Sequence, residues 1–133
     1  MKKVKHEIKI GDESITVEVI GDEKDGTTRL DADDLVRAQR ELGLTIILRH
    51  KDPKDLMPAH FNFLVNVSGL RGKDLARYLK VEPGNISQWR REKGISAVAW
   101  QAFRMLFFDL FTNGRVTNRI LLSNVEDRPE DAA

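Results

Sequence analysis

The spacing of apolar residues differs between the two ends of this 133-residue chain, and that difference most constrains its fold. In residues 4–20 apolar side chains alternate with polar ones, whereas from about Pro58 onward they recur every three or four residues. Alternation is typical of half-buried strands, and the longer spacing is typical of helices that bury one face. The sequence therefore predicts an α+β protein, in which a strand-containing unit precedes an all-helical domain.

The amino-terminal unit is predicted to have the order β-β-α-β. Two strands are expected within residues 4–10 and 15–19, joined by a turn at 11–14 and followed by a loop over 21–28. Asp31 is expected to cap the next helix.

That helix is expected to end at Gly43, because glycine commonly follows the last helical turn. The β-branched, apolar stretch at residues 45–50 then predicts a third strand.

Three segments are predicted along the chain. Residues 1–52 form the β-β-α-β unit, which is expected to bind a partner or to mediate dimerisation. Residues 53–115 form the all-helical domain, with Gly69 ending one helix and Ser96 capping a helix over 97–112. Residues 116–133 form a carboxy-terminal extension with a disordered acidic tail.

Charge is unevenly distributed, although the whole chain has a net charge of +1. Residues 71–93 contain seven basic and three acidic side chains, a net charge of +4. Residues 1–50 have a net charge of −2, and the last eight residues sum to −3. This distribution places any polyanion contact at residues 71–93, although a solvated helix face can have the same composition.

Residues 70–95 carry the motif on which the functional prediction depends. Two short helices that pack at a steep angle need apolar residues at fixed positions, and a small residue where they approach most closely. Ala76 fits the close approach, and Pro83 suits the first position of the second helix. The residues expected to point inward are Leu75, Leu79, Val81, Ile86 and Trp89.

The chain resembles the Xre/Cro-type helix-turn-helix of bacterial and phage regulators through the run KDLARYLKVEPGNISQW. The preceding FNFLVNVSGL resembles the first helix of that family, and ISAVAWQAFRMLF resembles its later helices. Within the family the likeness, over residues 58–112, is greatest to MqsA-like and HigA-like antitoxins. It implies a sequence-specific repressor that binds double-stranded DNA and, as an antitoxin, autoregulates the operon of a toxin–antitoxin pair.

The chain also departs from the family pattern. Lys80 occupies the turn between the two motif helices, where glycine is usual, so its backbone must adopt the turn without the freedom of glycine. Gly72 replaces a common glutamine, and Arg90 replaces a common acid. The absence of cysteine excludes the zinc-binding domain of MqsA proteins.

A DNA-binding role predicts two groups of contacts around the second motif helix, about residues 83–92, which is expected to lie in the major groove. An amide or guanidinium group can form two hydrogen bonds with the edge of one base, and a glycine lets the helix backbone approach the DNA closely. The predicted base-reading residues are Gly84, Asn85, Gln88 and Arg91. The predicted phosphate contacts, which supply salt-dependent affinity, are Arg71, Lys73, Arg77, Ser87, Arg90 and Lys93.

Residues 97–112 are predicted to form a dimerisation helix, because domains of this kind bind palindromic operators as homodimers. Their apolar stripe is broader than one core face requires, although burial against the amino-terminal unit would also explain it. The predicted dimer contacts are Trp100, Phe103, Phe107, Phe108 and Phe111.

Catalysis is not expected. The three histidines, His6, His50 and His60, lack metal-site spacing, and no phosphate-binding glycine loop or serine nucleophile motif is present. We therefore expect neither a cofactor nor a metal. The sequence has no secretory signal and no apolar stretch long enough to span a bilayer, so a cytoplasmic location is expected.

Two alternatives to the antitoxin remain open. The chain could be a stand-alone phage or plasmid repressor, with the amino-terminal unit serving dimerisation or effector sensing. It could also be a protein–protein adaptor in which a helix-turn-helix fold never contacts DNA.

Overall fold

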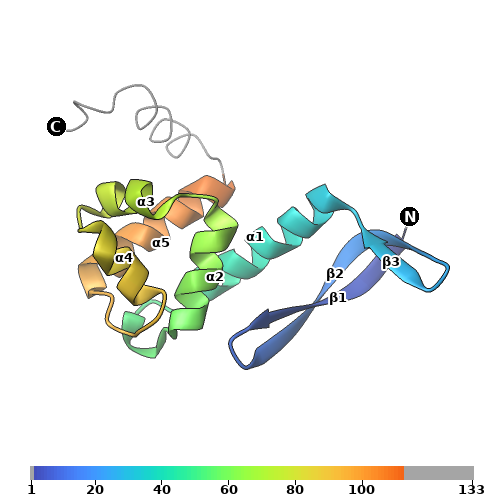
Figure 1. Cartoon of the computed structure of the whole chain (residues 1–133), viewed down its shortest axis with the longest axis horizontal. Helices are drawn as coiled ribbons and strands as arrows, with labels where there is room; N and C mark the ends of the chain where they lie inside the picture. Colours follow the sequence, from blue (N-terminus) through green and yellow to red (C-terminus); the bar gives the residue numbers. More distant parts are fainter. Residues whose placement is uncertain (1, 113–133) are drawn as a thin grey trace, which may run out of the picture.

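A computed structural model describes residues 2–112 (Figure 1). Within that range a three-stranded antiparallel sheet precedes the helices, so the predicted α+β class is confirmed. The strands are β1 (Lys2–Ile10), β2 (Glu13–Lys24) and β3 (Thr27–Leu30). The helices are α1 (Ala32–Arg49), a 3-10 turn η1 (Pro53–Asp55), α2 (Pro58–Ser68), α3 (Gly72–Leu79), α4 (Pro83–Trp89) and α5 (Ala97–Thr112). The predicted extension at 116–133 lies outside the described residues.

The first two strands form the predicted hairpin. Ile10 pairs with Glu13 across a two-residue turn, and Val4 pairs with Val19 further along. The apolar residues of the alternating pattern share one face, on which Ile8 and Val19 are buried. The period of two therefore predicted both strands and the face that they bury.

The loop predicted at residues 21–28 is wrong. Strand β2 continues to Lys24 and pairs with β3 through a register that joins Gly21 to Leu30. Asp25 and Gly26 form the turn with φ angles of 53° and 75°. Positive φ at both central residues is the geometry that an Asp-Gly pair favours in tight hairpins, so the sequence did contain this signal.

The third strand predicted at residues 45–50 is also wrong, because those residues continue α1 as far as Arg49. Asp31 caps α1 as predicted, since its carboxylate accepts a 3.0 Å hydrogen bond from the Asp34 N–H. Ile46 and Ile47 are buried in the helical core, and that burial outweighs the strand preference of β-branched residues. The fold is therefore β-β-β-α at its amino-terminal end.

Gly43 does not end the helix but lets α5 approach it. A Cβ atom at this position would lie 2.5 Å from Cζ of Phe107, closer than side chains tolerate. The sequence signal was a glycine in a helical pattern, which serves either a helix end or a close packing contact. Here it serves the packing contact.

Side chains of α5 bond the carboxy-terminal end of α1 and the residues that follow it. Trp100 donates from Nε1 to the carbonyl of His50 at 2.7 Å, and Arg104 donates from Nε to the carbonyl of Ile47 at 2.7 Å. Gln101 donates to the carbonyl of Lys51 at 2.6 Å. Carbonyls at a helix end lack partners within the helix, so these donors help to hold residues 45–49 in helical form.

One hydrophobic cluster joins the sheet to the helices. It contains Ile8 and Ile10 of β1, Ile46 and Ile47 of α1, and apolar residues from every helix of the described chain except η1. Figure 1 shows α1 running from the sheet to the group formed by α2, α3, α4 and α5. The boundary predicted at residues 52 and 53 follows α1, and core residues from both sides of it share this cluster.

Candidate nucleic-acid interface

Helices α3 and α4 are joined by a short turn that Lys80 makes possible. Lys80 has a left-handed backbone, with φ 60° and ψ 46°, and its N–H bonds back to carbonyls of α3. The N–H of Val81 donates to the carbonyl of Ala76 at 2.9 Å. The prediction that Lys80 adopts this turn although it is not glycine is confirmed. The left-handed conformation carries a steric cost at Lys80 that glycine would not have.

The inward-facing residues of the two helices lie where the spacing predicted. Leu75 and Ala76 of α3 and Ile86 and Trp89 of α4 are all buried in the core cluster. The Trp89 ring is nearly perpendicular to that of Phe61 on α2, with 6.1 Å between ring centroids. Pro83 is at the first position of α4 as predicted. These contacts fix the rotation of α4 about its own axis.

Because one side of α4 is buried, its polar residues are turned outward. Gly84, Ser87 and Gln88 are exposed, and Asn85 is half-buried. A Cβ atom at Gly84 would meet nothing within 4 Å. The helix ends at Trp89, earlier than predicted, so Arg91 lies in the following turn and donates from Nε to the carbonyl of Ser87 at 3.2 Å.

The predicted phosphate contacts are distributed from Arg71, just before α3, to the segment after α4, and Ser87 lies on α4 itself. Lys73, Arg77 and Lys93 are exposed. Arg71 is also exposed, and its Nε lies 2.9 Å from the carboxylate of Asp74, the single buried charged residue in the described part of the chain. The structure therefore brings basic side chains to α3 and to the end of α4.

Arg90 has a different place from the one predicted. Its Nε donates to Oδ1 of Asn62, and its Nη2 donates to Oδ1 of Asn66 at 2.7 Å. Both asparagines belong to α2, so Arg90 ties α4 to α2. Since its donors serve the fold, we assign it the role of positioning α4 rather than that of a phosphate contact.

The two asparagines were missed by the sequence analysis. Asn62 and Asn66 are four apart, and residues at that spacing lie on one face of a helix. Their partner Arg90 is 28 residues away from Asn62 in the sequence. Spacing within α2 could have shown that the two amides lie together, but only the tertiary fold shows what they bind.

The predicted dimer contacts on α5 need correction. Trp100, Phe103 and Phe107 are buried in the chain's own core and form a row of ring contacts along α5. They are therefore unavailable to a second copy. Phe111 is half-buried, and the guanidinium carbon of Arg40 lies 4.9 Å from the centre of its ring. Phe108 is 48% exposed.

A second apolar stripe of α5 is exposed instead. Val98 and Met105 are 82% and 70% exposed, and the three residues Val98, Met105 and Phe108 are seven and three positions apart. Such spacing places them on one face of the helix. Among residues 2–112, this face forms the exposed apolar part of α5.

No group of His, Asp and Glu residues that could hold a metal ion occurs in residues 2–112. Nor does that part of the chain contain a helix both long and apolar enough to cross a membrane. His50 and His60 come together, with ring centroids 4.9 Å apart, at the junction of α1 and α2. Burial, followed by the nearby charge of His60, lowers the pKa of His50 below its usual value.

Comparisons with known proteins give no relative for this chain: no family model, curated protein or solved structure matches it.

Proposed function

We propose that the chain is a sequence-specific double-stranded DNA-binding regulator of transcription that uses α3 and α4 as a helix-turn-helix of the Xre/Cro type. The observation that carries this proposal is the inward packing of Ile86 and Trp89, which turns Gln88 to an exposed face. Gly84 precedes it on α4 and Arg91 follows it. Amides and guanidinium groups are the side chains that read base edges in the major groove.

The charge of the surrounding residues supports the proposal. Residues 71–93 have a net charge of +4, and Lys73, Arg77 and Lys93 are exposed there. In this proposal Lys73, Arg77 and Lys93 contact phosphates, with Arg71 adding to them beside Asp74. Such contacts set the position of a protein on DNA and make its affinity fall as salt rises.

A second copy would pack on the exposed stripe of α5 formed by Val98, Met105 and Phe108. Two reading helices in one homodimer match two half-sites of a palindrome, and this multiplies specificity. Exposed apolar residues aligned along one helix face support such a contact. Repression of its own operon as the antitoxin of a toxin–antitoxin pair is the biological role that we propose for this dimer.

Selection of bound duplexes from a randomised double-stranded DNA pool tests the function and identifies the operator sequence in the same experiment. The full chain is expected to enrich a palindromic motif, and its affinity should fall steeply between about 50 and 200 mM salt. Enrichment of a single, non-repeated half-site would support DNA reading and reject the dimer. Failure to enrich any sequence at low salt would reject DNA binding and favour the adaptor alternative.

A further inference from the structure

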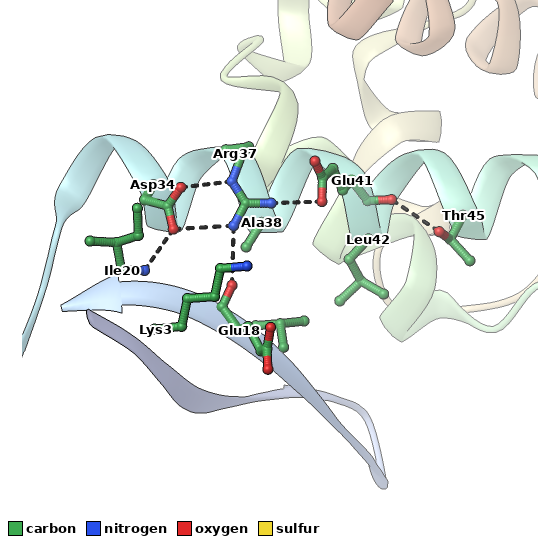
Figure 2. A pocket seen from close by; sticks show the side chains of 10 residues that line it. Lys3, Glu18, Ile20, Asp34, Arg37, Ala38, Glu41, Leu42 and Thr45 are labelled. Carbon is green, nitrogen blue, oxygen red and sulfur yellow. Dashed lines mark hydrogen bonds and ion pairs between the residues drawn. The ribbon is translucent and has the colours of Figure 1, made fainter. Parts of the chain in front are cut away.

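An open groove of about 640 Å³ lies between β2 and α1 (Figure 2). Figure 1 shows this part of the molecule at the opposite end from α3 and α4. Val17, Ala38 and Leu42 form its apolar part. Lys3, Glu18 and Glu41 lie among its charged residues. A volume of this size is in the range of sites that bind small ligands or short peptide segments.

One side of the groove is an edge of the sheet. The order β1-β2-β3 puts β2 in the middle, but β3 pairs only with residues Gly21 to Lys24 of β2. Beyond β3, the chain turns away into α1, so the rest of β2 pairs with β1 on one side only (Figure 2). On its other side the groove lies beside Val17, Glu18 and Ile20, and the edge continues past the groove towards the hairpin turn.

Residues of the β3–α1 junction and α1 bond the part of this edge nearest to β3. The N–H of Ile20 donates to the Asp34 carboxylate at 2.7 Å, and its carbonyl accepts from the Asp31 N–H at 2.8 Å. The carbonyl of Glu18 accepts from Nη2 of Arg37 at 3.1 Å. These bonds show that even-numbered residues of β2 direct their backbone groups away from β1.

The same alternation continues to the hairpin end of β2. Both backbone groups of a residue in an antiparallel strand point to the same side, and the side alternates from residue to residue. The N–H and C=O groups of Thr16 and Ser14 therefore face away from β1, as does the N–H of Glu18. Within residues 2–112 no hydrogen-bonding partner meets these groups.

The bonded end of the edge is held rigid by an ion cluster. Arg37 donates to both oxygens of Asp34, at 2.7 and 3.1 Å, and to Glu41 at 2.7 Å. The hydrogen bond from Arg37, followed by the one from Ile20, lowers the pKa of Asp34 to about 2. Asp34 therefore stays ionised at neutral pH, and Arg37 ties α1 to β2 within the groove.

We propose that the groove and the adjoining free edge of β2 bind an extended segment of a protein partner, which adds a strand to β2 in line with β3. The backbone groups of Ser14 and Thr16 and the N–H of Glu18 would supply the hydrogen bonds of this strand addition. Alternate side chains of the segment would lie over Val17, Ala38 and Leu42.

The charge of the groove lining indicates which side chains the rest of the bound segment should carry. Arg37 pairs with both Asp34 and Glu41, so the groove lining has two cations and three carboxylates, a net charge of −1: Lys3, Arg37, Glu18, Asp34 and Glu41. A net negative lining favours lysine or arginine at the positions between the apolar ones. The partner segment is thus an extended strand in which apolar and basic residues alternate. This site does not depend on DNA binding by α3 and α4.

A blocked peptide of about seven residues that alternates valine and lysine is a suitable probe, with a valine–glutamate peptide as its charge-reversed comparison. The full chain, labelled with ¹⁵N, is titrated with each peptide. We expect the valine–lysine peptide to bind more tightly. It should slow hydrogen exchange at the amides of Thr16 and Glu18.

Thr16→Pro tests the edge directly, because proline removes only an N–H that faces away from β1. Glu7→Pro is its matched control: Glu7 is the cross-strand partner of Thr16, and its N–H points to the opposite edge of the sheet. Thr16→Pro should weaken peptide binding by roughly tenfold or more, and Glu7→Pro should leave it unchanged.

If either proline variant fails to fold, Glu18→Lys and Glu7→Lys replace the pair. Only Glu18→Lys should then weaken binding of the valine–lysine peptide. The proposal is overturned if the valine–lysine peptide does not bind, or if it slows hydrogen exchange at amides of β1 instead of β2. It is also overturned if both variants of a pair lose the same binding affinity. A further contradicting result would be resonance shifts of groove side chains without slower exchange at the β2 amides. The last result would mean that the peptide lies in the groove without adding a strand to β2.

Discussion

At the scale of single residues, two glycines in helices have opposite surroundings. Gly43 of α1 faces Phe107, and an added Cβ would lie 2.5 Å from that ring. Gly84 of α4 has nothing within 4 Å. The sequence showed both glycines, but their surroundings depend on which helix packs against them.

Gly43→Ala should therefore destabilise the fold by about 1–3 kcal/mol, because α1 and α5 must separate to admit the methyl group. Gly84→Ala, the matched control, should be neutral or stabilising by up to about 1 kcal/mol, because alanine favours a helix. Urea denaturation of the two variants measures both changes. Equal effects would contradict the packing assigned to Gly43.

Lys80 is a residue whose backbone conformation favours glycine. Lys80→Gly should stabilise the fold by up to about 1 kcal/mol, because it removes the steric cost of the left-handed conformation. Lys80→Ala should give no such gain, since alanine keeps the Cβ atom. Thermal or urea unfolding of the two variants checks this, and a gain in Lys80→Ala as large as that in Lys80→Gly would contradict it.

At the scale of elements, the sequence predicted well where a local signal decides the structure. Asp31 caps α1, Gly69 ends α2 in a left-handed conformation, and the Ser96 hydroxyl accepts from the Ala99 N–H at the start of α5. The bounds predicted for α5, residues 97–112, are those observed. Each of these signals acts between residues a few positions apart.

The sequence analysis was wrong where contacts between residues far apart in the sequence determine the structure. Residues 45–49 have a strand-like composition, yet α5 bonds the carbonyl of Ile47 through Arg104 and buries its side chain. The roles of Asn62 and Asn66 depend on Arg90 in the same way. The groove beside β2 could not be predicted, because it depends on how α1 packs against β2, which the sequence does not show.

The junction of α1 and α2 should make stability depend on pH through His50. Its pKa is lowered in the fold, chiefly by burial, so the unfolded chain takes up a proton first. The free energy of unfolding should therefore decrease as the pH falls below the ordinary value of 6.5. The groups whose charges act on His50 are His60, Arg49, Asp55 and Glu13.

Urea denaturation at about pH 7.5 and 5.5 measures this dependence. His50→Gln should lose less stability over that interval than the unaltered chain, because glutamine does not titrate. His6→Gln is the control, since it removes a histidine of the sheet and leaves the His50 contribution in place. The same pH dependence in His50→Gln and the unaltered chain would contradict the assignment.

At the scale of the whole molecule, buried and exposed stripes of α5 have separate roles. Phe108→Glu combined with Met105→Glu should convert the proposed dimer to a monomer without unfolding it, because both side chains are largely exposed. Met57→Glu is the control, at an exposed apolar residue that precedes α2. Light scattering gives the mass of each variant, and a monomeric unaltered chain would contradict the proposed dimer.

The central claim is that the exposed face of α4 reads DNA bases while α3 contacts the backbone. Binding of Gln88→Ala and Lys73→Ala to the selected duplex and to a random duplex tests this claim most directly. Gln88→Ala should lose about 1–3 kcal/mol on the selected duplex and almost nothing on the random one. Lys73→Ala should weaken binding to both and reduce the salt dependence. Equal losses for the two variants on both duplexes would contradict the account.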